Sequence, residues 1–536
     1  MTARVWSSDV RPVRFGGHDG LGYVDSPSTF DDLLSGTNVW TDRTFLVHGE
    51  RRISFAAFRS AVAVARPMLA SLGVAPGDRV MVFGYNSPEW IVALWATWCS
   101  GAVPVLANRW WSAAELTHAV DLLRPRHVLS DTNLAIDAPC SALADLRPAF
   151  DAAGDEDTAA PDTDGDATAL VLFTSGSSGM PKAVELSRRS VIANQHNILA
   201  RNRRFPHLLD ADSPQAVSLA TTPMFHVGGL SSLLTHFLTG GKIVITEGRF
   251  DAGQILGLIE REGIQIWGAV PTMAIRLLEH PDFESFDLSS LKSWPLGGAP
   301  VTTDLLDRIR AKLPNLRQRG LSNTWGMTEA GGFLTAGDAR DLAVHPGTVG
   351  RPYGVVELRI ADPNPEGVGE VLARSPTVMN GYAGLPADDT VDADGWLHTG
   401  DLGHLTEDGY LFIDGRSKDV VIRGGENIAC PHVEAAIASH PAVVEVAAMG
   451  IPHPELGEEL VAVVVHRAGA TLTVAGLVEH VTGTLSYFAV PTRWEIRAEP
   501  LPTLAGEKVD KKSLARSFAA EGGPLPIPPM GIHSST

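Results

Sequence analysis

The sequence has few cysteines, an excess of acid over base and no long apolar run. Its three cysteines, Cys99, Cys140 and Cys430, lie far apart in a chain of 536 residues, so neither a disulfide framework nor a cysteine metal site follows from their spacing. A reducing, cytoplasmic setting is the simplest expectation. The formal net charge of -19 argues against nucleic acid as a partner, because phosphate backbones bind to basic surfaces.

No stretch of the sequence indicates secretion or membrane insertion. The N-terminus, MTARVWSSDVRPVRF, lacks the apolar core of a signal peptide. The longest uncharged run, Ile91–Asn108, is interrupted by Gly101 and Pro104. This interruption favours a buried helix followed by a strand over a membrane span. We therefore expect no integral membrane segment.

The length predicts at least two domains. Expected strands and helices alternate in the first part of the chain, which predicts a layered α/β domain with parallel strands. Ser54 and Ser87 are candidate helix caps, and Pro88 suits the first turn of a helix. The expected helices are 56–72, 86–100 and 113–123, and the expected strands are 79–83, 103–106 and 127–129.

A smaller α+β domain is expected towards the C-terminus. Helices are expected at 433–439 and 472–485, and strands at 443–449 and 460–466. The tail is rich in Pro, Gly and Ser, which is typical of a mobile end. The predicted units are a large domain at 1–414, a small domain at 415–521 and a flexible tail at 522–536.

A polar, glycine-containing loop follows an expected buried strand at 169–173. Its residues are Thr174, Ser175, Gly176, Ser177, Ser178 and Gly179, and Lys182 lies just beyond them. Glycines let backbone N–H groups approach an anion, while hydroxyls and a lysine add donors and charge. A surface turn is the alternative for such a cluster. The Walker pattern is absent, since Met180 and Pro181 follow Gly179, so this is not the loop of a P-loop NTPase.

Further clusters of small and polar residues follow in order. Each alone is compatible with a turn or a packed core residue. Together, in this order and approximate spacing, they resemble the motifs of the adenylate-forming superfamily of acyl-CoA synthetases, luciferases and adenylation domains. The resemblance extends from about Phe55 to Leu514. The clusters are 223–230, 297–300, 323–329, 396–401, 414–419 and 424–428.

The resemblance implies an acyl-CoA synthetase with two half-reactions. A carboxylate attacks the α-phosphorus of ATP to give acyl-AMP and pyrophosphate, and the thiol of coenzyme A then displaces AMP. ATP, Mg²⁺, coenzyme A and a small-molecule carboxylic acid are therefore the expected partners. No cationic side chain marks the acyl pocket, so a fatty or other hydrophobic acid is expected. Fatty, aryl and sterol-derived acids all remain open.

The resemblance also implies roles for single residues. Residues 174–179 and Lys182 would hold the β- and γ-phosphates, Thr328 the α-phosphate and Glu329 the magnesium ion. Lys508 would be the catalytic lysine of adenylation, and Lys418 the hinge. Gly298, Ala299 and Pro300 would lie along one face of adenine and Trp325 would cover the other, while Asn323, Thr324, Gly326 and Met327 would also belong to the ATP- and AMP-binding site. The ribose would contact Asp401 and Arg416. The acyl pocket would contain His226, Val227, Gly228, Gly331 and Gly332, and the CoA tunnel Gly424, Gly425 and Glu426.

The chain departs from the family pattern at several places. Trp325 stands where Tyr is frequent, Ala183 where Gly is usual, and Glu507 replaces the Gly before Lys508. Glu507 could form an ion pair with Lys508 and so reduce the effect of its positive charge. Lys511 and Lys512 are nearby alternatives to Lys508 as the catalytic lysine. Two other functions remain open: an acyl-AMP ligase that loads a carrier protein, and a nucleotide-binding homologue without catalysis. The sequence also leaves a homodimer open.

Overall fold

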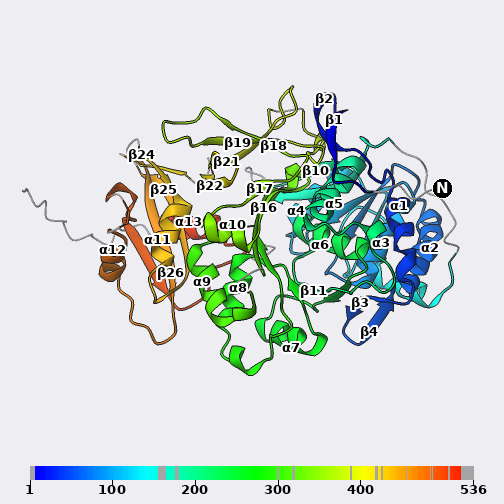
Figure 1. Ribbon diagram of the computed structural model, residues 1–536, viewed down its shortest axis with the longest axis horizontal. Helices are drawn as coiled ribbons and strands as arrows, with labels where there is room; N and C mark the ends of the chain where they lie inside the picture. Colours follow the sequence, from blue (N-terminus) through cyan, green and yellow to red (C-terminus); the bar gives the residue numbers. More distant parts are fainter. Residues whose placement is uncertain are drawn as a thin grey trace, which may run out of the picture.

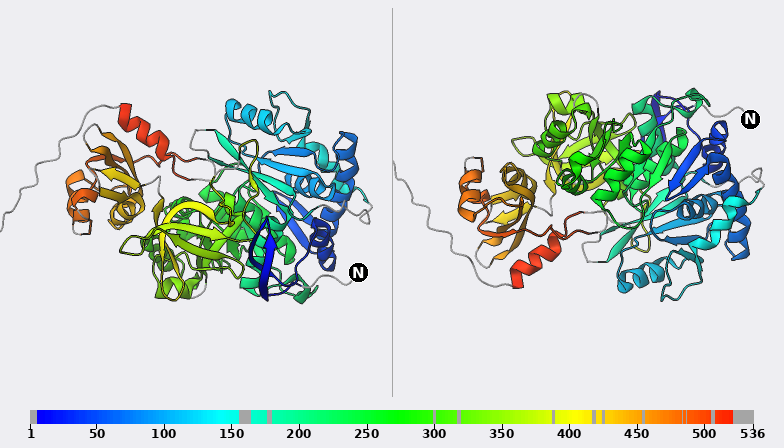
Figure 2. Two further views of the ribbon diagram at one scale, coloured as in Figure 1. Left: turned by 90° about the horizontal axis from the view of Figure 1, so that it is seen from above. Right: turned by 90° about the horizontal axis from the view of Figure 1, so that it is seen from below.

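The protein consists of a large N-terminal domain and a small C-terminal domain. In the computed structural model the small domain, orange to red, lies at one end of the molecule (Figures 1 and 2). The predicted fold class, mixed α/β with two domains of unequal size, is confirmed. The structure describes residues 6–154, 164–175, 180–298, 301–316, 320–386, 389–416, 420–423, 426–453, 456–482, 484–485, 487–504 and 508–520.

The first large sheet carries the predicted phosphate loop at one side. Its centre is parallel, as expected, but β9 and β10 form an antiparallel pair, with Ser175 opposite Pro181. The cause is the short connection between them, since a parallel pair requires a longer crossover. The strand order is β20-β10-β9-β6-β5-β7-β8. The bounds are β5 Arg79–Phe83, β6 Val103–Ala107, β7 His127–Ser130, β8 Cys140–Ala142, β9 Thr168–Ser175, β10 Pro181–Ser187 and β20 Gly381–Tyr382.

The second large sheet has the order β13-β11-β12-β3-β4. Two isolated parallel bridges connect the end of this sheet to β14 of the next one. The bounds are β3 Thr44–His48, β4 Arg51–Ser54, β11 Val217–Ala220, β12 Lys242–Ile245 and β13 Ile266–Trp267. The next sheet contains β14 Trp294–Gly297, β15 Leu321–Met327, β16 Gly332–Gly337 and β17 Arg351–Pro352.

Two helices of the large domain begin at the serine caps that the sequence predicts. The hydroxyl of Ser54 accepts from the N–H of Ala57, and that of Ser87 from the N–H of Trp90. These caps satisfy backbone donors that have no partner within the helix. The bounds are α1 Phe30–Ser35, α2 Phe55–Ser71, α3 Pro88–Cys99, α4 Ala113–Leu123, α5 Arg188–Asn202, α6 Val227–Leu238, α7 Ala252–Glu262, α8 Pro271–Leu278, α9 Thr303–Lys312 and α10 Ala339–Val344.

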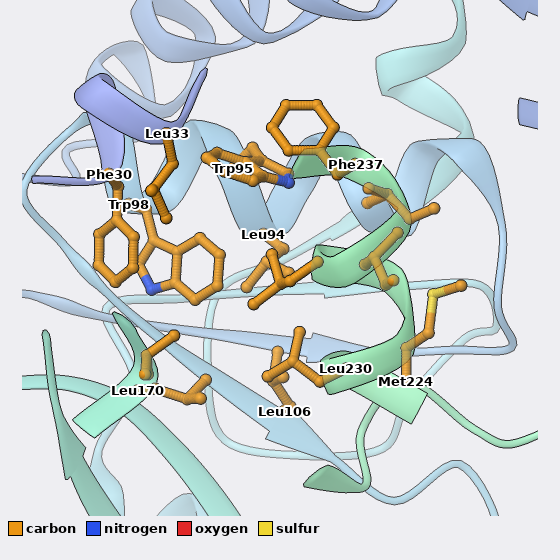
Figure 3. Packing of buried hydrophobic residues seen from close by; sticks show 14 of the residues in the cluster. Phe30, Leu33, Leu94, Trp95, Trp98, Leu106, Leu170, Met224, Leu230 and Phe237 are labelled. Atoms are coloured by element: carbon orange, nitrogen blue, oxygen red, sulfur yellow. The ribbon is translucent and has the colours of Figure 1, made fainter. Parts of the chain in front are cut away.

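The main core of the large domain surrounds α3, of which every residue is buried. Figure 3 shows Trp95 and Trp98 of α3 between α1 and α6, with Phe30 stacked on Trp98 and Phe237 near Trp95. The uncharged run of the sequence is thus a buried helix followed by β6, as predicted. No helix within the described ranges combines the length and apolarity needed to cross a membrane.

Two smaller sheets complete the large domain. The N-terminal strands β1 Val10–Phe15 and β2 His18–Tyr23 form one pair. A second sheet has the order β18-β19-β21-β22 and includes the predicted Asp408-Gly409 hairpin turn, where Gly409 has φ +82°. Its bounds are β18 Glu357–Ala361, β19 Gly369–Arg374, β21 Leu397–Leu405 and β22 Leu411–Arg416. Short 3₁₀ helices are η1 Gly36–Trp40, η2 Leu143–Asp151, η3 Pro206–Leu208, η4 Phe283–Ser285, η5 Pro314–Leu316 and η6 Thr328–Ala330.

The small domain has its own sheet, of order β24-β23-β26-β25 with β27 beside β26. Both faces bear apolar clusters, one under α11 and α12 and one under α13. Gly415 and Arg416 still pair with β21, and the boundary after residue 414 stays a prediction. The predicted tail 522–536 lies outside the described residues. The bounds are β23 Val420–Arg423, β24 Glu426–Ala429, α11 Cys430–Ala438, β25 Val443–His453, β26 Gly457–His466, α12 Val474–Thr482, η7 Tyr487–Ala489, β27 Arg493–Arg497 and α13 Lys511–Ala520.

Candidate active site

A cleft of about 2750 Å³ is lined by residues of both domains. It gathers most of the described residues that the sequence predicts for the site. Those lining it are Thr174, Lys182, His226, Val227, Gly228, Gly298, Asn323, Thr324, Trp325, Gly326, Met327, Thr328, Glu329, Gly332, Asp401 and Lys508.

Several predicted site residues cannot be placed in this cleft. The predictions for Gly176, Ser177, Ser178, Gly179, Ala299, Pro300, Lys418, Gly424 and Gly425 fall outside the described residues. Only the backbone is described for Ser175, Arg416 and Glu426. Their proposed roles stay predictions.

The predicted phosphate end of the cleft lies between β10 and the turn after β15. Lys182 lies opposite Thr174 in the strand pair, and its Nζ lies 4.5 Å from the centre of the Tyr382 ring. The hydroxyl of Tyr382 donates to Oε1 of Glu329 at 2.9 Å. Glu329 is buried, with 7% of its surface exposed. Tyr382 was missed from the sequence, because only its pairing with β10 reveals its place.

The carboxylate of Glu329 fits a magnesium ion that arrives with ATP. The described residues contain no group of three or more His, Cys, Asp or Glu side chains able to form a complete metal cage. Mg²⁺ is often held by one or two carboxylates together with substrate phosphates. Glu329, close to Thr328 and the strand pair of the phosphate loop, provides such a carboxylate.

The predicted adenine cover and ribose carboxylate are directly connected. Nε1 of Trp325 donates to Oδ2 of Asp401 at 2.7 Å, and Asp401 is 4% exposed. The N–H of Asp401 donates to Oγ1 of Thr399 at 3.1 Å, which further fixes the strand. Asp401 on β21 lies opposite Arg416 on β22. The indole of Trp325 therefore fixes the orientation of this carboxylate.

Two neighbouring polar side chains already have protein partners. The amide of Asn323 donates to the carbonyl of Thr348 at 3.0 Å, and Oγ1 of Thr324 donates to the carbonyl of Leu296 at 3.4 Å. They hold β15 against its surroundings, and their contacts with ATP stay predictions. Gly298 has φ +78°, a left-handed conformation that favours glycine.

Lys508 lies next to the predicted adenine loop. A Cβ at Gly298 would be 3.9 Å from Cε of Lys508. Burial lowers the pKa of His226 to about 4, and the positive charge of Lys508 contributes to the lowering. Of the alternative lysines, Lys511 forms an ion pair with Glu434 at 2.6 Å. Lys508, Lys511 and Lys512 all line the cleft, but it is the charge of Lys508 that acts on His226, while Lys511 is paired with Glu434.

The predicted acyl pocket begins at the N-terminus of α6. His226 is neutral at ordinary pH, and among the described residues its buried Nε2 has no hydrogen-bond partner. A Cβ at Gly228 would meet only Cζ of Phe333, at 4.0 Å. Phe225 and Trp110 also line the cleft and pack edge to face. This part of the cleft is thus largely aromatic and leaves room beside Gly228.

Gly331 and Gly332 also have a packing role that the sequence does not reveal. A Cβ at Gly331, where φ is +66°, would lie 2.1 Å from the carbonyl oxygen of Thr377. A Cβ at Gly332 would lie 2.0 Å from Oδ1 of Asn194. Glycine is required at both positions because other segments of the chain approach closely. A contact of either residue with the acyl group stays a prediction.

Ion pairs connect the two domains beside the cleft. Nη1 of Arg467, in the small domain, donates to both oxygens of Glu279, at 2.8 and 2.9 Å. Glu279 also pairs with Arg308 within the large domain. Arg276 of α8 lies 3.8 Å from Glu445 of β25. Figure 1 shows α8 and α9 next to the small domain, in the arrangement that brings Lys508 to the cleft.

Comparison with family models assigns both parts of the chain. Residues 36–383 match the model described as AMP-binding enzyme, and residues 432–506 match that of the AMP-binding enzyme C-terminal domain. These matches cover the phosphate-loop region and most of the small domain.

Similar proteins and structures agree with this assignment. A feruloyl-CoA synthase from Amycolatopsis is 33% identical over 494 residues, covering 89% of this chain and 96% of the relative. An indoleacetate–CoA ligase from Aromatoleum aromaticum is 32% identical, covering 90% of this chain and 98% of that one. ATP-bound MatB from Rhodopseudomonas palustris superposes with a TM-score of 0.79 at 27% identity, covering 91% of this chain and 99% of MatB.

A further structure shows the reaction intermediate in the same fold. The o-succinylbenzoate CoA synthetase of Bacillus subtilis, in complex with its acyl-adenylate, superposes with a TM-score of 0.76 at 25% identity, covering 91% of this chain and 98% of that one. This chain is an acid–thiol ligase of the AMP-forming type, and its reaction uses ATP, Mg²⁺ and coenzyme A. The cleft, the two matched domains and the CoA-ligase relatives show that the chain belongs to the AMP-binding enzyme family, the adenylate-forming acyl-CoA synthetases.

Proposed function

We propose that the enzyme activates an aromatic or other hydrophobic carboxylic acid as acyl-AMP and transfers the acyl group to coenzyme A. The observation that carries this proposal is the cleft, where Lys508, Glu329 and the Trp325–Asp401 pair lie around one space. Aromatic side chains and the room beside Gly228 support a hydrophobic acyl group.

The relatives narrow the expected acid. The names of the reported relatives refer to feruloyl and indoleacetate groups, and a rice 4-coumarate–CoA ligase, 31% identical over 479 residues, adds a third aromatic acid. None of these three names refers to a fatty acid, which the sequence suggested as a substrate. An aryl acid with a short carboxylate-bearing chain is therefore the substrate that we favour.

Joining a carboxylate to a triphosphate brings anions together, so the site must supply positive charge and donors. In this proposal Lys182 and the loop before it hold the outer phosphates, while Glu329 holds the magnesium ion. Lys508 balances the charge that develops as the carboxylate attacks the α-phosphorus. His226, which stays neutral, forms part of the wall around the reacting carboxylate without adding charge.

The catalytic lysine is tested by separating the half-reactions. Lys508→Ala is expected to abolish acid-dependent pyrophosphate release, because the transition-state charge loses its cation. The same variant should still form thioester from supplied acyl-AMP and coenzyme A. Lys512→Ala, which removes an exposed lysine of the same segment, serves as the control and should retain both steps. Equal loss of both steps in Lys508→Ala would refute the assignment.

The predicted CoA tunnel is tested by adding bulk. Gly425→Leu should slow thioester formation more than adenylation, because a side chain there would obstruct the pantetheine arm. Unchanged CoA-dependent turnover in this variant would contradict the tunnel assignment.

A further inference from the structure

We propose that Tyr382 is a positioning residue that holds the phosphate-loop cation Lys182 over the face of its ring and the magnesium carboxylate Glu329 at its hydroxyl. This inference rests on the proposed function in one respect, the role of Glu329 towards Mg²⁺. The ring receives the ammonium group of Lys182 at 4.5 Å from its centre, and its hydroxyl donates to Glu329 at 2.9 Å. One side chain thus contacts both charges at the phosphate end.

The position of this ring is fixed by the strand pairing around it. Tyr382 lies directly opposite Val184 in the antiparallel pair of β20 and β10. Lys182 is two residues from Val184 and lies on the same face of the sheet, where a diagonal neighbour is within reach of a long side chain. The N–H of Ala383 donates to the carbonyl of Ala183 at 2.8 Å, which holds the strand next to Tyr382.

The same segment is also bonded to the turn that carries the carboxylate. The N–H of Met379 donates to the carbonyl of Glu329 at 2.9 Å. Residues 379–383 therefore connect β10 to η6 through the backbone as well as through the Tyr382 side chain. A displacement of Tyr382 would change its contacts with both Lys182 and Glu329, so this side chain couples the positions of the two groups.

The arrangement keeps two opposite charges from neutralising each other. Among the described residues no ion pair is found between Lys182 and Glu329, although both contact the Tyr382 side chain. The face of an aromatic ring attracts a cation, while a phenolic hydroxyl donates to an anion. Tyr382 therefore stabilises each group separately. The hydroxyl occupies one oxygen of Glu329 and leaves the other for a metal ion.

Tyr382→Phe tests the hydroxyl alone, because it retains the ring under Lys182. We expect the dissociation constant of Mg·ATP, measured by calorimetry without any acid substrate, to rise about tenfold, as for other residues that support a metal ligand. Binding of ATP in the presence of EDTA should change less than about twofold, since Lys182 keeps its ring contact. Melting temperatures within a few degrees of wild type confirm that the variant is folded.

Two further variants make the test decisive. In Glu329→Gln, adding Tyr382→Phe should cause little further loss of Mg·ATP affinity, because both changes remove one shared interaction. Tyr382→Leu should also weaken ATP binding in the absence of magnesium, because the ammonium group of Lys182 loses its contact with the aromatic ring. Unchanged Mg·ATP affinity in Tyr382→Phe, or an equal loss with and without magnesium, would overturn the inference. Since the assay needs no acid, failure to find a substrate leaves this test intact.

Discussion

Arg467→Met should shift the balance between the two half-reactions. The structure holds Lys508 in the cleft, while the family resemblance predicts that the small domain turns away for thioester formation. The ion pair between Arg467 and Glu279 crosses the interface between the two domains, so it stabilises the domain arrangement in which Lys508 lies in the cleft. Removing it should favour the alternative arrangement.

The size of the effect follows from the exposure of the pair. The Arg467 side chain is 43% exposed and that of Glu279 25% exposed, so solvent screens the interaction. Such pairs contribute up to about 1 kcal/mol. This corresponds to a change of about fivefold in the domain equilibrium. No buried charge is left unpaired in the variant, because Glu279 retains Arg308.

The assay measures each half-reaction in single turnover. We expect pyrophosphate release to slow by two- to fivefold, and thioester formation from supplied acyl-AMP to stay constant or accelerate. The difference in pyrophosphate release between Arg467→Met and the wild type should shrink at about 1 M salt, where charges are screened within about 3 Å. Arg308→Met is the matched control, since it removes the partner within the large domain and leaves the interface pair. Equal slowing of both steps, or the same shift in Arg308→Met, would refute the reasoning.

Three further predictions concern the nucleotide, the acyl group and pH. Trp325→Phe removes the N–H that orients Asp401, so the KM for ATP should rise about fivefold, as for loss of a hydrogen bond to a charged group, and the preference for ATP over 2′-deoxy-ATP should fall; an unchanged preference would contradict this role. Gly228→Val should fill the space next to Phe333 and raise the KM for bulky aryl acids more than that for acetate, and an equal effect on both would argue against this pocket. Burial lowers the pKa of His196, on α5, to about 4, while a histidine of the unfolded chain titrates near 6.5. Between these pH values the unfolded chain binds more protons than the folded one, so the stability of the fold falls as the pH drops through this window. The melting temperature should therefore decrease from pH 7 to pH 5, and it should decrease less in His196→Gln.

The sequence predicts the local parts of the fold well. The helices after Ser54 and Ser87 begin as predicted because a cap depends on residues within one turn. The expectation of parallel strands was incomplete. It misses the antiparallel pair of β9 and β10, because the pattern of apolar residues does not specify the direction of a neighbouring strand.

Contacts between distant segments explain what the sequence could not show. Trp325 and Asp401 were predicted for one nucleotide site, but their hydrogen bond spans two sheets and has no local signal. Tyr382 was not recognised at all, since its importance comes from β10 and Glu329, both far away in the chain. The requirement for Gly331 comes likewise from the carbonyl of Thr377, which only the folded chain brings near.

The most direct test of the account is pyrophosphate release with Mg·ATP across aryl, fatty and polycyclic acids, each with and without coenzyme A. We expect release that depends on an aryl or similar hydrophobic acid, with AMP and an acyl-CoA thioester formed when coenzyme A is present. Acid-dependent release without thioester formation would contradict coenzyme A as the acceptor. Binding of ATP with no release for any acid of the panel would contradict the proposed ligase activity.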